Sequence, residues 1–285
     1  MTSGLSTSVE GAPLKHAVLI GAGRMGSAMA RGWVQDLGAA GVGRLSVVER
    51  APTEDVVEAA EDKLIVLNPS PEPADILVLA VKPQGFAGVA DALKAWVSPQ
   101  TLVVSIMAGV TIARISSALG CEKVARAMPN TPGAIGMGVT AFALSSACGD
   151  AESVATGKLL EPLGLVIGPL NEEQMDAVTA VSGSGPAYVF LLVEALAAAG
   201  RSAGLGEATA NALARETIVG AGALLGNSAE SPADLRKAVT SPGGTTAAAL
   251  DVLMSAGGMP DLMRKAVDAA ARRGAELSRE AEKKG

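Results

Sequence analysis

The 285-residue sequence has few aromatic side chains, two cysteines and one histidine. Aromatic residues make up 2% of the chain, which leaves few rings on which nucleic-acid bases could stack. Cys121 and Cys148 are too few for a disulfide framework, and one histidine without Cys-x-x-Cys spacing provides no zinc cluster. These shortages argue against a disulfide-stapled domain and predict a protein without a metal site.

The sequence also lacks an excess of basic residues and a long apolar run. Its net charge of −6 does not suit a partner made of phosphates. The best membrane-span candidate, "YVFLLVEALAAAG", is broken by Glu194. The opening "MTSGLSTSVEGAPLK" has no basic start and no apolar stretch, so residues 1–15 are predicted to be a flexible tail rather than a signal peptide. We expect a cytoplasmic protein that binds neither nucleic acid nor membranes.

Residues 16–170 alternate between short apolar runs and helix-like segments. The runs "HAVLI", "RLSVVE", "DILVLAV", "TLVVSIM" and "KVARAM" are typical of strands buried on both faces of a parallel sheet. Helical patterns such as "RMGSAMARGWVQDL", "FAGVADALKAWV" and "TIARISSAL" separate them, and "AESVATGKLLEPLG" follows. This alternation predicts a doubly wound, Rossmann-like α/β domain.

The pattern changes near residue 170. Segments rich in Ala, Leu and Val, separated by Gly, Ser and Pro, predict an all-helical second domain over residues 171–285. No aromatic residue follows Phe190. Helices faced with Ala and Gly can approach closely, which suits a dimer interface and equally a compact monomeric bundle.

A first glycine-rich turn follows the first predicted strand and opens a helix. Gly21, Gly23 and Gly26 fit the Gly-x-Gly-x-x-Gly pattern of dinucleotide-binding domains. In that pattern the first glycine permits a tight turn, the second admits the pyrophosphate, and the third lets helix and strand pack closely. The helix N-terminus then offers free N–H groups and a positive dipole end.

Charged residues after the second predicted strand bear on the choice of cofactor. The carboxylate of Glu49 is placed to accept hydrogen bonds from the adenosine ribose of NAD and to repel a 2′-phosphate. Arg50 or Arg24 could instead pair with that phosphate. Both charges at 49 and 50 could also be ordinary solvated residues, so NADH and NADPH both stay open, with Glu49 favouring NADH.

A second glycine-rich turn, "TSPGGTT" at 240–246, precedes a predicted helix in the second domain. Its backbone N–H groups and hydroxyls could bind a carboxylate without any basic side chain. Ser, Pro and Gly at a helix start can also act merely as a cap. The motif alone does not choose between these interpretations.

Six segments, taken in order, resemble the pyrroline-5-carboxylate reductases: "GAGRMG", "AVKPQ", "VVSIMAGVT", "RAMPNTP", "AVSGSGPAYVF" and "VTSPGGTTAAALDVL". The similarity runs from about residue 16 to 275. It implies a Rossmann-like domain, a helical dimerisation domain and dimers that often assemble into larger rings. It also implies reduction of 1-pyrroline-5-carboxylate to L-proline with NADH or NADPH, the last step of proline biosynthesis.

The resemblance assigns site residues by position. Its cofactor segments match Gly21, Ala22, Gly23, Arg24, Met25, Gly26, Asn68, Ala80, Val81, Lys82, Pro83, Ile106, Met107 and Ala108. Its substrate segments match Glu172, Thr179, Ser182, Gly243, Gly244, Thr245 and Thr246, with Thr246 expected near the ring nitrogen. Arg24 stands where other members often carry Asn, and Ala238 stands where some members carry Asn.

Hydride transfer to an iminium needs alignment more than a charged catalyst. The only histidine, His16, precedes the first predicted strand, at the end of the sheet opposite to the expected site, and is not expected to act. A rival β-hydroxyacid dehydrogenase would use a lysine on a helix, but residues 171–200 contain none. A dinucleotide-binding sensor without turnover would keep the first turn and have no need of "TSPGGTT".

Overall fold

The computed structural model describes residues 15–283. Residues 1–14 of the predicted tail lie outside the described part, and Lys15 already belongs to the first strand. The chain forms two compact units. The first unit runs to Gly183 and includes the end of the chain from Arg273, and the second unit is Ser184–Arg272.

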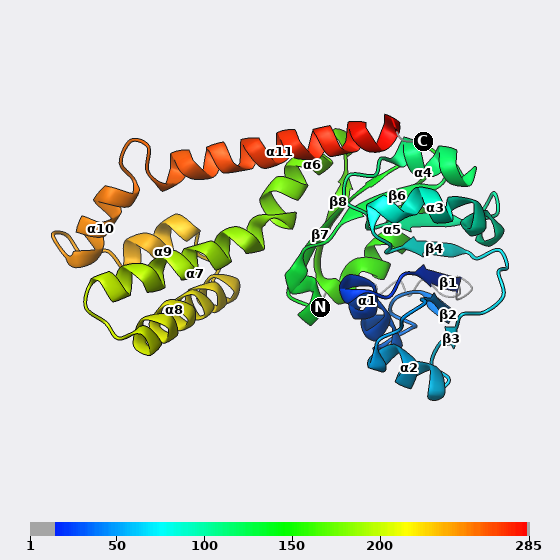
Figure 1. Ribbon diagram of the computed structural model, residues 1–285, viewed down its shortest axis with the longest axis horizontal. Helices are drawn as coiled ribbons and strands as arrows, with labels where there is room; N and C mark the ends of the chain where they lie inside the picture. Colours follow the sequence, from blue (N-terminus) through cyan, green and yellow to red (C-terminus); the bar gives the residue numbers. More distant parts are fainter. Residues whose placement is uncertain (1–14, 284–285) are drawn as a thin grey trace, which may run out of the picture. The chain divides into compact units, whose positions relative to one another are not determined.

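The first unit is built on an eight-stranded sheet, in the order β3-β2-β1-β4-β5-β6-β7-β8 (Figure 1). Strands β3 to β6 are parallel to one another in the order of a dinucleotide-binding domain. The strands are β1 (Lys15–Ile20), β2 (Val42–Val48), β3 (Val66–Leu67), β4 (Ile76–Leu79), β5 (Leu102–Ser105), β6 (Val124–Met128), β7 (Gly138–Leu144) and β8 (Gly164–Leu170). The Rossmann-like prediction is confirmed.

The sheet is not parallel throughout, which corrects the prediction. Strand β7 runs antiparallel to β6, and β8 pairs parallel to β7. Only residues 129–137 separate β6 from β7, and they form the short helical turn η2 (Thr131–Ile135). A parallel return needs a crossover of a dozen or more residues, so this connection forces the chain to turn back.

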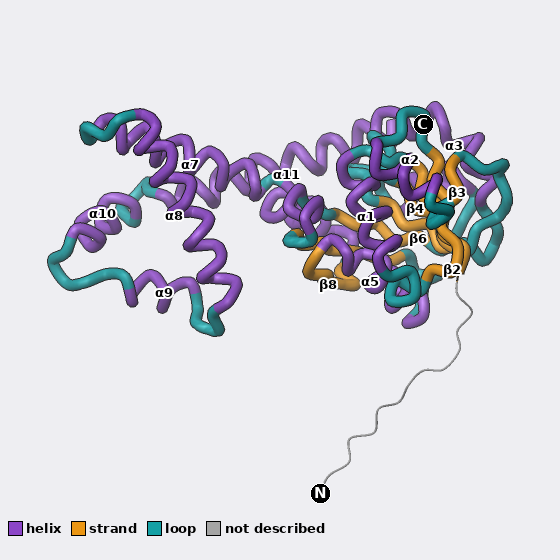
Figure 2. The backbone as a smooth tube through the Cα atoms, turned by 90° about the horizontal axis from the view of Figure 1, so that it is seen from below, coloured by secondary structure: helices purple, strands orange, loops and turns teal. Residues whose placement is uncertain are grey.

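Helices cover both faces of this sheet, as the strands flanked by helices in Figure 2 show. Alternate residues of β1 enter two separate cores: Ala17 and Leu19 join one, and Val18 and Ile20 the other. The first core is closed by α1 and α5, and the second by α3 and α4. The helices of this unit are α1 (Arg24–Gln35), α2 (Glu54–Glu61), α3 (Pro83–Leu93), η1 (Lys94–Trp96), α4 (Ile112–Leu119), α5 (Asp150–Leu160), η3 (Glu161–Leu163), η4 (Glu172–Gln174), α6 (Met175–Val178) and the π-helix η5 (Thr179–Gly183).

The second unit is helical. It contains α7 (Gly185–Ser202), α8 (Glu207–Asn227), α9 (Pro232–Ala238), α10 (Thr245–Leu253) and the first part of α11 (Met259–Lys283). Helices α7 and α8 pack through small residues, since a Cβ at Gly200 would lie 3.3 Å from the Cβ of Ala210. Most large apolar side chains of the unit stay exposed, among them Phe190, Leu191 and Leu213.

The compact units divide at a different place from the predicted domain boundary near residue 170. Residues 172–183 pack onto the first unit, where Met175 and Ala180 are fully buried. The last helix, α11, was not recognised in the sequence, and its end from Arg273 belongs to the first unit. The domain boundary near residue 170 therefore stays a prediction.

One helical stretch in the described part, Glu172–Ser202, is long and apolar enough to cross a membrane by length and composition alone. The stretch reaches this length because η4, α6, η5 and α7 join end to end, and it includes Glu194, so it is not an uninterrupted apolar run of the kind that the sequence lacks. Only 11% of its most apolar window is buried within the chain. Apolar surface of this extent is typical of an interface with a protein partner or a membrane.

Candidate active site

The first glycine-rich turn joins β1 to α1, and two of its glycines are required by the chain's own packing. Gly21 has a φ of +93°, and a Cβ there would lie 2.9 Å from the carbonyl oxygen of Ala80. A Cβ at Gly26 would collide with the carbonyl oxygen of Gly21. At Gly23 a Cβ would meet nothing within 4 Å, so this position opens outward. These are the three roles predicted for the motif.

The N-terminus of α1 fits a dinucleotide phosphate group. Gly23 occupies the N-cap position, no side chain caps the helix, and its first turn holds no acidic residue. The backbone N–H groups and the positive end of the helix dipole are thus open to an anion. Arg24, exposed at the first helical position, adds a cationic side chain, and Met25 follows half-buried.

Glu49 lies beside this turn and is held to it. Its carboxylate accepts hydrogen bonds from the backbone N–H of Ala22 at 2.8 Å and of Ala51 at 3.0 Å. These bonds, Ala51 first, hold the pKa of Glu49 below its usual value. The side chain of Asn68 makes two hydrogen bonds with the Glu49 backbone: it donates to the carbonyl at 3.0 Å and accepts from the N–H at 2.9 Å. Asn68 itself has a φ of +48°. Glu49, Asn68 and the turn thus form one connected cluster, with Arg50 exposed next to it.

The segments after β4 and β5 meet at the same edge of the sheet. Ala80 and Val81 follow β4, Lys82 is the N-cap of α3, and Pro83 begins that helix. Ile106 and Ala108 follow β5, and between them Met107 is buried in the second core. In open α/β sheets this carboxyl edge is where ligands bind.

A cavity of about 450 Å³ opens at this edge of the first unit. Its lining includes Pro83 and Ala108, both predicted to contact the cofactor, and Thr179, predicted to contact the substrate. Asp176 and the end of α11 at Leu277 complete part of the wall. The sequence prediction did not include α11, so this wall was missed.

The carboxylate of Glu172 makes hydrogen bonds within the first unit. Its Oε1 accepts from the backbone N–H of Ile112 at 2.7 Å and from Arg126 at 3.2 Å. Arg126 is only 5% exposed and also lies 3.5 Å from Asp176. This ion-pair cluster, with a buried arginine and two partly exposed carboxylates, ties the start of α4 and the middle of β6 to the helical segment before η5. Sequence reasoning missed Arg126, because nothing in "KVARAM" separates it from a surface arginine.

The other two substrate-side residues of the first unit lie on the π-helix η5. The Thr179 hydroxyl donates to the carbonyl of Met175 at 2.8 Å. Ser182 accepts from the side-chain amide of Asn130 at 3.3 Å. Asn130 belongs to "RAMPNTP", one of the segments that carry the family resemblance, and it was not among the predicted site residues. Single π-turns within helices occur often at functional sites.

The second glycine-rich turn lies in the second unit. Gly243 has a φ of +70°, and Gly244 is the N-cap of α10 with a φ of −82°. No side chain caps this helix and its first turn has no acidic residue. Thr245 and Thr246 are its first two residues, Thr246 half-buried and Thr245 exposed. The hydroxyls of this motif therefore do not cap the helix, and the N-cap position is held by Gly244, so the choice between a carboxylate site and a plain helix start stays open.

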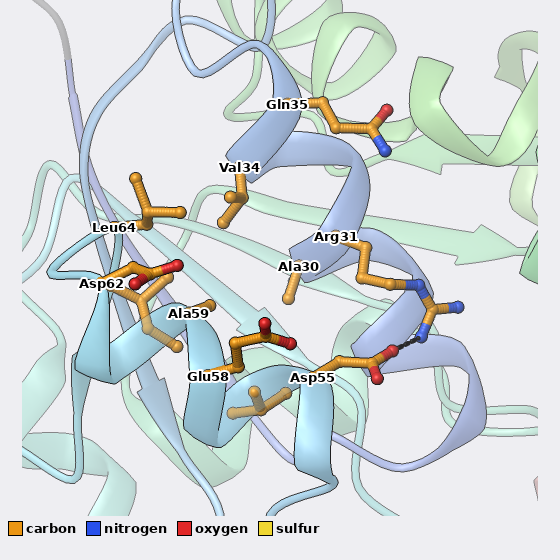
Figure 3. Close-up of a pocket in the computed structure, with 11 residues that line it drawn as sticks. Ala30, Arg31, Val34, Gln35, Asp55, Glu58, Ala59, Asp62 and Leu64 are labelled. Carbon is orange, nitrogen blue, oxygen red and sulfur yellow. Dashed lines mark hydrogen bonds and ion pairs between the residues drawn. The ribbon is translucent and has the colours of Figure 1, made fainter.

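A second cavity, of about 270 Å³, lies between α1 and α2 (Figure 3). It is lined by Asp55, Glu58 and Asp62, with an ion pair of 2.8 Å between Arg31 and Asp55. None of the predicted site residues lines it.

His16 lies in β1 with its Nε2 3.0 Å from the Ser46 hydroxyl, and burial, followed by the charge of Arg44, lowers its pKa. Within residues 15–283 the structure shows no group of three or more His, Cys, Asp or Glu side chains placed to hold a metal ion.

Two family models match the chain. Residues 172–277 match pyrroline-5-carboxylate reductase dimerisation. Residues 16–109 match a family described as "NADP oxidoreductase coenzyme F420-dependent".

Curated relatives and solved structures cover most of the chain. A Pseudomonas aeruginosa pyrroline-5-carboxylate reductase is 42% identical over 72% of this chain and 75% of its own length. Pyrroline-5-carboxylate reductase 2 of Bacillus subtilis is 35% identical over 93% of this chain and 95% of its own length. The structure of a pyrroline-5-carboxylate reductase from Coxiella burnetii has a TM-score of 0.82 at 34% identity, covering 93% of this chain and 99% of that one. The structure of a Plasmodium falciparum pyrroline carboxylate reductase with NADP bound has a TM-score of 0.75 at 27% identity. It covers 94% of this chain and 100% of that one.

Proposed function

The chain belongs to the pyrroline-5-carboxylate reductase family, and we propose that it reduces 1-pyrroline-5-carboxylate to L-proline with NAD(P)H. The observation that carries this proposal is the cavity at the carboxyl edge of the sheet. There, Pro83 and Ala108 from the cofactor side and Thr179 from the substrate side share one wall. The proposed reaction is the last step of proline biosynthesis.

The first unit holds the cofactor in this proposal. The open N-terminus of α1 and the outward-facing Gly23 receive the pyrophosphate, since neither a side-chain cap nor an acidic residue competes for it. Glu49 and Asn68 hold the adenosine ribose, because a carboxylate with two bonds accepted still has lone pairs for hydroxyls. The nicotinamide end is bound by residues 80–83 and 106–108.

The remaining residues orient the imine. When bound, the reduced nicotinamide supplies the hydride. Residues 243–246 offer backbone N–H groups and hydroxyls to the substrate carboxylate, and Thr246 donates or accepts one hydrogen bond at the ring nitrogen. The family resemblance also assigns Glu172, Thr179 and Ser182 to the substrate. If the imine binds protonated, addition of hydride gives a neutral amine and no acid residue has to deliver a proton in that step.

Mixing the purified protein with NADPH or NADH and the cyclic imine tests the reaction. We expect loss of nicotinamide absorbance with formation of an equal amount of proline, identified by mass spectrometry. Tight cofactor binding without turnover would instead support a dinucleotide sensor. Turnover of β-hydroxyacids and none of the imine would support the dehydrogenase alternative.

Assembly into at least a dimer is supported by the dimerisation match over 172–277 and by the exposed apolar side chains of α7 and α8. The apolar stretch Glu172–Ser202 lies almost wholly within that match, so a second copy of the chain accounts for its low burial. We propose a homodimer that assembles further into a larger ring, in the cytoplasm. Light scattering at low micromolar concentration tests this, and a monomer there would contradict it.

A further inference from the structure

Asn130 connects two segments that are distant in the sequence. It lies between β6 and η2, and its side-chain Oδ1 accepts from the backbone N–H of Val139 at 3.0 Å. Its Nδ2 donates to the Ser182 hydroxyl at 3.3 Å. A Cβ added at Gly138 would lie 2.8 Å from Oδ1, so the amide sits tightly against the start of β7.

The direction of both hydrogen bonds is fixed by chemistry. A backbone N–H can only donate, so Oδ1 of Asn130 must face Val139. The Nδ2 group, which can only donate, is then the atom that faces Ser182. The Ser182 oxygen therefore accepts this bond, and its own hydrogen is left to be donated elsewhere.

The segment that carries Ser182 is held on both sides. Ala180 is fully buried, and a Cβ at Gly183 would lie 2.6 Å from the terminal carbon of Met128 on β6. The burial of Ala180 and the close packing of Gly183 against Met128 hold η5 against β6, next to Asn130. The polarity set by the amide is thus built into the local packing.

We propose that Asn130 is a positioning residue that makes Ser182 a hydrogen-bond donor to a carboxylate oxygen of the imine substrate. This rests on the proposed function, in which Ser182 is a substrate-side residue. An ionised carboxylate only accepts hydrogen bonds, so a serine obliged to donate matches it. Asn130 and Ser182 both belong to the first unit.

Asn130→Asp tests this with almost no change in shape. The introduced carboxylate can still accept from Val139, but its other oxygen also accepts, so Ser182 must turn its hydrogen toward it. We expect kcat/KM for the imine to fall about tenfold to a hundredfold, the range for losing a hydrogen bond to a charged group. The fall should come mainly through KM for the imine, with the dissociation constant of NADPH and the melting temperature close to wild type.

A double-mutant cycle separates the polarity of Ser182 from a direct effect of the new charge. In a Ser182→Ala background, Asn130→Asp should change kcat/KM by less than about twofold, since no hydroxyl remains to be reversed. The same loss in both backgrounds would overturn the proposal. Asn211→Asp, at an exposed site where Oδ1 accepts from Arg201, is a matched control for an added carboxylate.

The outcomes also separate this inference from the proposed function. A wild-type protein that does not reduce the imine refutes both. A wild-type protein that does reduce it, together with an unchanged KM in Asn130→Asp, overturns the role of Asn130 alone.

Discussion

The two glycine-rich turns look alike in the sequence, and the structure shows that their glycines are needed for different reasons. In the first turn, side chains at Gly21 or Gly26 would strike the chain's own backbone. In the second turn, a Cβ at Gly243 would meet nothing within 4 Å, although its φ of +70° favours glycine. At Gly244, φ is −82° and a Cβ would meet only the Ser241 region, at 3.2 Å.

Folding therefore explains two glycines of the first turn, and in the second turn it explains Gly243 through its backbone conformation but not Gly244. Packing accounts for two of the three glycines of the first turn, and only Gly23 needs a ligand to explain it. For Gly244 neither backbone conformation nor a buried contact demands glycine, which is consistent with close approach of a ligand or a partner. Substitutions in the two turns should accordingly separate stability from activity.

The largest effect on stability is expected for Gly26→Ala. The new methyl group would collide with the carbonyl oxygen of Gly21, a backbone atom that cannot rotate away. We expect a loss of about 3 kcal/mol in the free energy of unfolding, the upper part of the range for overpacking a rigid site. Thermal and urea denaturation measure it.

Gly23→Ala is the matched control in the same turn. Its Cβ has open space and its φ of −68° suits alanine, so stability should stay within about 0.5 kcal/mol of wild type. NADPH affinity should fall. If Gly26→Ala melts like Gly23→Ala, packing does not explain the first turn.

Gly244→Val should affect activity rather than stability. Its side chain would occupy the space in front of the N–H groups that open α10, so kcat/KM for the imine should fall by roughly 2–4 kcal/mol, as for loss of a placed donor. NADPH affinity should not change. Gly244→Ala carries the same Cβ contact with Ser241 and less bulk, so it distinguishes strain from obstruction. A folded Gly244→Val with intact imine reduction would reduce the second turn to a helix start.

Thr246→Ala should have a smaller effect in the same turn. One neutral hydrogen bond at the ring nitrogen contributes about 1–2 kcal/mol, and the hydroxyl is not needed to cap α10. Steady-state kinetics with the imine should show the loss, while denaturation curves overlay those of wild type. An equal loss of stability would mean that Thr246 serves the fold.

The sequence predicted those parts of the fold that depend on local pattern. Strands β1, β2, β4, β5 and β6 are apolar runs with clear boundaries, whereas β3 has two residues and half of the residues in α2 are acidic. The reversal of β7 depends on the length of the preceding connection, and α11 is a polar helix whose end returns to the first unit.

For the site, glycine spacing predicted the first turn correctly in its geometry. The contacts of Arg126 with Glu172 and of Asn130 with Ser182 join residues far apart in the chain, and no local pattern encodes them.

The smallest predicted effect is a difference in pH dependence between the two turns. The first turn is bonded to an ionised group, Glu49, whose pKa is lowered by backbone N–H donors, Ala51 first and then Ala22. The second turn, at 240–246, contains no titratable side chain.

The sign follows from linkage. Because the pKa of Glu49 is lower in the folded protein than the ordinary value of 4.5, its contribution to stability is fully present above 4.5 and is lost as the pH falls through the folded value. Solvent screens this half-exposed group, so the contribution should be below about 1 kcal/mol. We expect the difference in melting temperature between wild type and Glu49→Gln to shrink as the pH is lowered from 7 to 4, because acid removes from wild type what the substitution has already removed. The difference between wild type and Gly244→Val should keep the same value over that range, because nothing in the second turn titrates. A Glu49→Gln difference that stays constant would show that the carboxylate bonds to Ala22 and Ala51 do not hold the first turn in place.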